Sequence, residues 1–340
     1  MKTKRIIFVL FLIGLFGCCY YVMNQHYDEL ARYPYELSDD EREVVLAHLD
    51  AEGINYLVTQ KIEPDQFLPF LEIEDFDLNN TLWYTRAMAT REEDAAYIVN
   101  FINKYRDHMQ YGALVSLLTN YNYNVLTRFY DEGSPYGENL NLIADPTQRY
   151  TLIKKTQTLY TYEPKSLVVI TDLPHDNIVD NLNDILIQEE VVTPLKELLA
   201  AAKEINQKEY GDMTIIAGYM SYEDQIALFE QMKKEYATDF DKRWDLPGQS
   251  EYQLGYTISL RPNEDTSQSD VLSTEEKEQA NWLKENAYKY GFIIRYAKQK
   301  ESVTGKTYQP YTLRYVGKET AKIMYDQEKA MEEMDFTAVK

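Results

Sequence analysis

The sequence predicts a helical region followed by a domain that mixes short strands with helices, and three patterns along its 340 residues indicate this order. An apolar run of 18 residues, 6–23, stands near the start. In residues 28–145 the apolar positions recur with helical spacing. After that stretch, short runs of β-branched and aromatic residues alternate with helical segments, which is typical of a mixed domain.

The apolar run predicts an N-terminal membrane anchor over residues 1–26. As a helix it would be about 27 Å long, enough to cross a bilayer core. Lys2, Lys4 and Arg5 precede it, so the positive-inside rule places the rest of the chain outside the cytoplasm. A second interpretation stays open, because LFGC before Cys19 resembles a bacterial lipoprotein cleavage site that would leave Cys18 lipidated.

The overall charge narrows the classes of partner. The formal net charge is −21, which argues against binding of nucleic acid or of an anionic membrane surface. The chain has two cysteines, Cys18 and Cys19, and neighbours in sequence almost never pair, so we expect no structural disulfide.

Residues 27–145 are predicted to form a helical extracytoplasmic region. Ser38 with Glu41, and Thr90 with Glu93, match the capping-box pattern at helix starts. Residues 131–145 are rich in Gly, Asn and Pro, so we expect the boundary between the two regions there.

The second region is predicted to contain five short strands and at least two capped helices. Thr193 with Pro194 predicts one helix start, and Ser273 with Glu276 predicts another. Residues 261–272 are polar and rich in turn-forming types, which indicates a loop. The predicted strands are residues 168–170, 214–217, 256–260, 292–296 and 312–316.

Residues 246–260 read LPGQSEYQLGYTISL. This segment resembles the metal-binding segment of the zinc D-alanyl-D-alanine carboxypeptidases of the vancomycin-resistance type, roughly R-P-G-x-S-E-H-Q-x-G-x-A-x-D. In that family the His and the Asp, seven residues apart, bind zinc. The corresponding residues here are Tyr252 and Ser259.

The resemblance extends over about half the chain. Residues 215–229, IIAGYMSYEDQIALF, are similar to the family's S-G-Y-R-S-Y-x-x-Q. Met220 stands at the position of the family's substrate-binding Arg, and Gln225 at the position of its Gln. Residues 282–296, WLKENAYKYGFIIRY, are similar to the corresponding sequence segment of the family. Residues 309–317, QPYTLRYVG, are similar to the family's E-P-W-H-x-R-Y-V-G. Gln309 stands at the position of the general-base Glu, and Thr312 at the position of the His that is the third zinc ligand.

The resemblance implies an α+β fold for residues 146–328, with a small, mainly antiparallel sheet flanked by helices. Residues 329–340 would follow as an acidic C-terminal tail.

The resemblance also implies a zinc cofactor, but the residues at its positions do not suit one. A catalytic zinc takes imidazole and carboxylate ligands, whereas Tyr252, Ser259 and Thr312 carry hydroxyls that stay neutral at pH 7. The last of the four histidines is His175, so none lies within these motifs. We therefore expect no intact metal site and no cofactor.

The remaining positions favour binding over catalysis. Gln309 cannot exchange a proton as Glu does, and Met220 cannot bind a carboxylate as Arg does. Gln225, Ser250 and Tyr311 carry hydrogen-bonding groups and are predicted to contact a ligand.

Three functions stay open at this point. The first is a membrane-attached pseudopeptidase, meaning a peptidase-like domain without activity, that binds a peptidoglycan peptide or a cell-envelope protein. The second is an active D,D- or L,D-carboxypeptidase with an unconventional site. The third is a purely structural surface protein.

Overall fold

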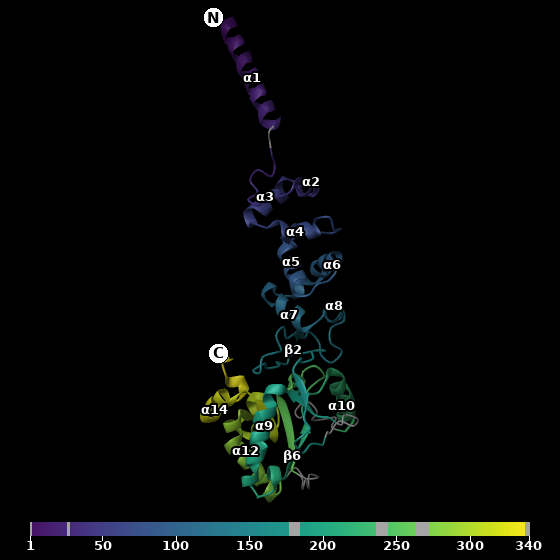
Figure 1. Ribbon diagram of the computed structural model, residues 1–340, viewed down its shortest axis with the longest axis vertical. Coiled ribbons are helices and arrows are strands. Elements are labelled where there is room, and N and C mark those ends of the chain that lie inside the picture. The colour runs from purple at the N-terminus through teal and green to yellow at the C-terminus, as the bar shows by residue number, and fades with distance from the viewer. Residues whose placement is uncertain (1, 26–27, 177–183, 236–243, 263–271, 337–340) are drawn as a thin grey trace. The chain divides into compact units, whose positions relative to one another are not determined.

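The computed structural model of this chain describes residues 2–25, 28–176, 184–235, 244–262 and 272–336. The chain divides into two compact units, Met1–Val115 and Ser116–Lys340 (Figure 1). Each unit is described below by itself.

Every described element that lies wholly in the first unit is a helix. The core forms around α2, α3 and α4 from residues that include Leu30, Val45 and Phe67, all of them buried. The helices are α1 (Lys2–Gln25), α2 (Asp39–His48), α3 (Ala51–Gln60), α4 (Pro64–Leu71), α5 (Thr81–Thr90) and α6 (Ala95–Tyr105), while α7 (Leu114–Asn120) crosses the division between the units.

The N-terminal residues form α1, but they do not support the predicted membrane-spanning helix. Across the described residues, no helix combines the length and the apolar character that a bilayer crossing requires.

One of the two predicted capping boxes in this unit is confirmed. Ser38 caps α2, since its side chain accepts a bond from the Glu41 N–H while the Glu41 carboxylate binds the Ser38 N–H. The prediction for Thr90 is wrong, because Thr90 is the last residue of α5. Asp94 caps α6 instead, accepting bonds from two free N–H groups of its first turn.

The second unit has the predicted α+β architecture, with small antiparallel sheets and helices. Its largest sheet has four antiparallel strands in the order β5-β6-β8-β7. The strands of this sheet are β5 (Met213–Ala217), β6 (Thr257–Pro262), β7 (Phe292–Tyr296) and β8 (Gln309–Tyr315). Two two-stranded pairs accompany it. One is antiparallel, β3 (Leu167–Val169) with β4 (Leu186–Gln188), and the other is parallel, β1 (Asn141–Leu142) with β2 (Gln157–Thr158).

Helices flank this sheet. In Figure 1, α9, α12 and α14 lie on one side of β6 and α10 lies on the other. The helices of the unit after α7 are α8 (Tyr123–Glu132), α9 (Glu189–Ala201), α10 (Tyr222–Glu235), α12 (Thr274–Asn286), α13 (Glu301–Thr304) and α14 (Lys318–Asp326).

The helix starts predicted for this unit had different outcomes. Ser273 and Glu276 form the predicted capping box at the start of α12. The start predicted at Thr193 is wrong, because α9 already begins at Glu189, directly after β4. Pro194 therefore lies inside the helix, where it lacks one backbone donor. The earlier start adds a first turn that buries Val191, which offsets that loss.

The segment around the predicted boundary near residue 145 packs against residues that follow it. Asn141 and Leu142 pair with Gln157 and Thr158, and the Phe129 ring lies 5.2 Å from the Tyr160 ring. The boundary at 145 stays a prediction. Of the predicted loop 261–272, residues 263–271 lie outside the described residues.

A group of buried charges joins distant parts of the second unit. The Glu251 carboxylate accepts two hydrogen bonds from Arg295, at 2.8 and 2.7 Å, and its Oε2 lies 3.5 Å from Nη1 of Arg314. Arg295 also binds Glu332 at 2.7 Å, which attaches the predicted C-terminal tail to the sheet. Burial opposes ionisation of Glu251, but Arg295 and Arg314 outweigh it and lower the pKa of this carboxyl.

We predict that Glu251→Gln lowers the free energy of unfolding by roughly 3–5 kcal/mol, because it leaves two buried guanidinium groups with too little negative charge. Urea denaturation of the purified full chain measures this. Lys322→Met, which removes an exposed pair with Asp326, is the control and should leave the midpoint near that of the wild type. A similar midpoint for both variants would contradict the prediction.

Candidate functional site

Residues 246–260 run from a tight turn through a short helix into β6. Ser250 caps the 3-10 helix Glu251–Leu254, and Gly255 ends it with a φ of 75° before β6 begins at Thr257. Gly248 has a φ of 81°, and a Cβ there would lie 2.6 Å from the Thr158 hydroxyl. Only glycine fits this turn without strain, so the turn fixes how the short helix faces the sheet.

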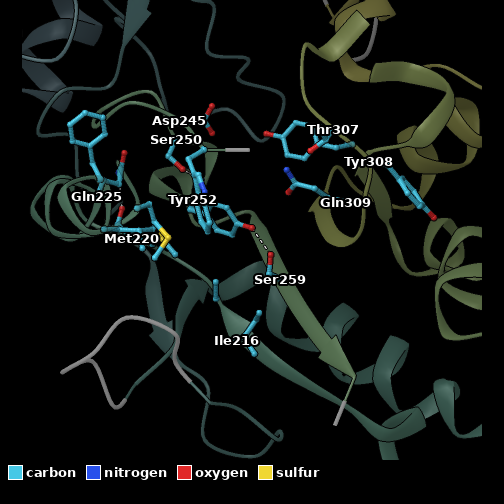
Figure 2. A pocket seen from close by; sticks show the side chains of 16 residues that line it. Ile216, Met220, Gln225, Asp245, Ser250, Tyr252, Ser259, Thr307, Tyr308 and Gln309 are labelled. Carbon is cyan, nitrogen blue, oxygen red and sulfur yellow. Dashed lines mark hydrogen bonds between the residues drawn. The ribbon is translucent and has the colours of Figure 1, made fainter. Parts of the chain in front are cut away.

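Four residues at the predicted catalytic and metal positions meet in one chain of hydrogen bonds. The Tyr252 hydroxyl is hydrogen-bonded to Oγ of Ser259, drawn as a dashed line in Figure 2, and the two oxygens lie 2.5 Å apart. Ser259 Oγ lies 3.3 Å from Oγ1 of Thr312, its register partner on β8. The Thr312 hydroxyl donates to Oε1 of Gln309 at 3.0 Å. We call these four residues the hydroxyl chain, because three of its members are hydroxyls.

The hydroxyl chain is neutral at physiological pH. Burial raises the pKa of Tyr252, and although bonds to Ser259 and Thr312 oppose this effect, the phenol keeps its proton. Elsewhere in the described part of the chain, no three His, Cys, Asp or Glu side chains gather closely enough to hold a metal ion.

Gln225 acts as a structural connector. Its Oε1 accepts from the Gly248 N–H at 3.0 Å, and its Nε2 donates to the carbonyl of Met220 and to Oε1 of Gln253. Gln253 in turn donates to the carbonyl of Tyr160 at 2.6 Å. The amide of Gln225 thus holds the Gly248 turn in place, although its side chain also lines a cavity.

Ser250 and Tyr311, the other two predicted ligand-binding residues, lie in different surroundings. Ser250 lines the cavity, and its Oγ accepts a bond from the Tyr252 N–H at 3.4 Å. Tyr311 is absent from the described lining, because its hydroxyl donates to the carbonyl of Glu276 in α12 at 2.7 Å.

The cavity beside the hydroxyl chain has a volume of about 280 Å³. Met220, which is 5% exposed, forms part of its apolar wall, while Tyr252, Ser259 and Gln309 form the polar side (Figure 2). The described lining residues are Ile216, Ala217, Met220, Gln225, Leu228, Phe229, Met232, Trp244, Asp245, Ser250, Tyr252, Ser259, Tyr296, Thr307, Tyr308 and Gln309.

Asp245 is a site residue that the sequence analysis missed. It lines the cavity, and its Oδ1 lies 2.8 Å from Nζ of Lys306, which also donates to the Trp244 carbonyl at 2.5 Å. Burial raises the pKa of the Asp245 carboxyl, and Lys306 opposes this shift. The only sequence signal for Asp245 was its place directly before LPGQS, since Lys306 is 61 residues away.

We predict that Tyr252→Phe lowers the free energy of unfolding by about 1 kcal/mol and keeps the fold, because the buried hydrogen bond to Ser259 is lost. Chemical denaturation measures the difference. Tyr325→Phe is the control, since the Tyr325 ring is 41% exposed and stacks on Tyr288, so its hydroxyl can reach water. Equal losses in the two variants would show that the hydroxyl chain contributes nothing to stability.

Comparisons with known proteins agree on one family. Residues 184–318 match the family described as VanY, D-alanyl-D-alanine carboxypeptidase. The putative carboxypeptidase YodJ of Bacillus subtilis is 34% identical over 200 residues, which cover 58% of this chain and 70% of that protein. A D-alanyl-D-alanine carboxypeptidase of Enterococcus faecium is 29% identical over 168 residues, or 48% of this chain and 50% of that protein.

Among solved structures, the LdcB LD-carboxypeptidase is 32% identical, with a TM-score of 0.48, over 58% of this chain and 90% of that one.

Proposed function

We propose that this chain, which belongs to the VanY family of D-alanyl-D-alanine carboxypeptidases, binds peptidoglycan peptides in its cavity without hydrolysing them. The matched family and relatives indicate a domain that binds or cleaves such peptides. The hydroxyl chain favours binding without cleavage, because its residues stand at the positions that, by the resemblance of the motifs, correspond to the family's zinc ligands and general base.

The side chains at these positions do not fit a catalytic zinc. Such an ion needs three ligands from imidazole and carboxylate groups and an open position for water. Tyr252, Ser259 and Thr312 offer neutral oxygens that already bind one another, at 2.5 and 3.3 Å. A metal would have to break these bonds and ionise a buried phenol whose pKa is raised.

No free general base stands beside the hydroxyl chain in the described part of the cavity. Gln309 is an amide, and its Oε1 already accepts a bond from Thr312. Asp245 is the one described carboxylate in the lining, and it is paired with Lys306 at 2.8 Å. The presence of this carboxylate in the cavity lining favours the second candidate, an active carboxypeptidase with an unconventional site.

We predict that the purified full chain contains no stoichiometric zinc and releases no D-alanine from a peptide ending in D-Ala-D-Ala. Elemental analysis and a D-alanine assay measure the two quantities, with the Enterococcus faecium carboxypeptidase as positive control. Activity that disappears with a chelator would overturn the proposal. Activity that persists with the chelator and is lost in Asp245→Asn would favour the unconventional enzyme.

The binding arm of the same experiment uses calorimetric titration with N-acylated muropeptides. Thr307 lines the cavity, so Thr307→Trp should fill it and weaken binding at least about tenfold, the effect of losing 1.4 kcal/mol of binding free energy. Val303→Trp is the matched control, because Val303 lies outside the described lining and is 40% exposed. Absence of binding to the wild-type chain would favour a protein partner or a purely structural role.

We also propose that the chain from residue 28 onward lies outside the cytoplasm, since peptidoglycan peptides are displayed there. Protease treatment of intact cells should then digest it, and full protection would contradict this location. Labelled fatty acid on the wild type, lost in Cys18→Ser, would identify the attachment as lipid on Cys18, which is exposed.

A further inference from the structure

The described cavity lining lacks the positive charge that would favour a ligand with a free carboxylate. None of the sixteen described lining residues is basic, and Asp245, whose carboxylate is paired with Lys306, is the one acidic residue among them (Figure 2). The others are apolar, hydroxyl or amide side chains. A ligand carboxylate placed here would lose water and face a charge of its own sign, and both changes are unfavourable.

The nearby described cations are already bound elsewhere. Lys306 pairs with Asp245 and donates to the Trp244 carbonyl. Arg295 and Arg314 are 3% and 0% exposed, and both lie against Glu251. Moving any of them to a ligand would leave a buried carboxylate without its partner, which is costly.

The polar groups of the cavity suit a neutral amide instead. The Asp245 carboxylate can accept a bond from an amide N–H, since ionised carboxylates are strong acceptors. The side-chain amide of Gln309, whose Oε1 is bound to Thr312, has a nitrogen that can donate to a carbonyl oxygen. Met220 presents a thioether, which cannot donate a bond to a carboxylate.

We propose that the cavity selects peptides whose terminal carboxyl group is blocked as an amide, as in a cross-linked or amidated peptide, and disfavours the free acid. This inference rests on the proposed peptide-binding function and adds the chemical class of the peptide end. It assigns Asp245 and Gln309 as the groups that recognise the amide.

The test compares two probes that differ only at the peptide end, Nα-acetyl-L-Lys-D-Ala-D-Ala and its C-terminal carboxamide. Calorimetric titration of the purified full chain at neutral pH and low salt should show at least about tenfold tighter binding of the carboxamide. Equal or tighter binding of the free acid overturns this inference and leaves the peptide-binding function standing. If neither probe binds and muropeptides also fail, both the function and the inference are overturned.

Charge variants test the cause of the preference. Met220→Arg should reverse it by adding a guanidinium to the cavity wall, whereas Val303→Arg, which adds the same charge outside the described lining, should not. Asp245→Asn provides a second route if Met220→Arg fails to fold. It should strengthen binding of the free acid selectively, and an unchanged ratio of the two affinities in folded variants would overturn the assignment.

Discussion

The Glu251 carboxylate is the group on which the second unit depends most. It receives two hydrogen bonds from Arg295 on β7 and lies 3.5 Å from Arg314 on β8. The short helix that carries Tyr252 is thereby fixed to two strands of the sheet. Because both guanidinium groups are almost fully buried, neither can turn to water, and the three charges must stay together. This pairing needs no metal ion.

The position of the cavity walls follows from this arrangement. Gln225 and Gln253 connect the Gly248 turn to the chain near Tyr160, and buried amides of this kind specify a single geometry when all their bonds are made. The shape of the cavity is therefore maintained in part by Gln225, which is itself a lining residue, and by Gln253. The hydroxyl chain is held by bonds among its own members, from Tyr252 through Ser259 and Thr312 to Gln309.

The hydroxyl chain and Asp245 give the cavity an uncharged polar side and one paired carboxylate. Such a surface suits hydrogen bonding to a neutral peptide better than hydrolysis, which requires a polarised carbonyl and an activated water. The wall around Met220 is apolar and buried, so a mismatched charge there is penalised more than it would be at the surface.

Sequence alone predicted the α+β class and the approximate strands, because short motifs and the spacing of apolar residues are local properties. The four residues of the hydroxyl chain were selected by the resemblance to the family, and only the structure showed that they bind one another. With Thr193 as the N-cap, sequence alone placed the first residue of α9 at Pro194 instead of Glu189, since packing of Val191 outweighs the local preference of Pro194. Only the tertiary structure decided that Tyr311 turns to Glu276 and that Gln225 supports the Gly248 turn. The tertiary structure also brought Asp245 to Lys306, because a pairing across 61 residues depends on how the chain folds back and leaves no periodic pattern in the sequence.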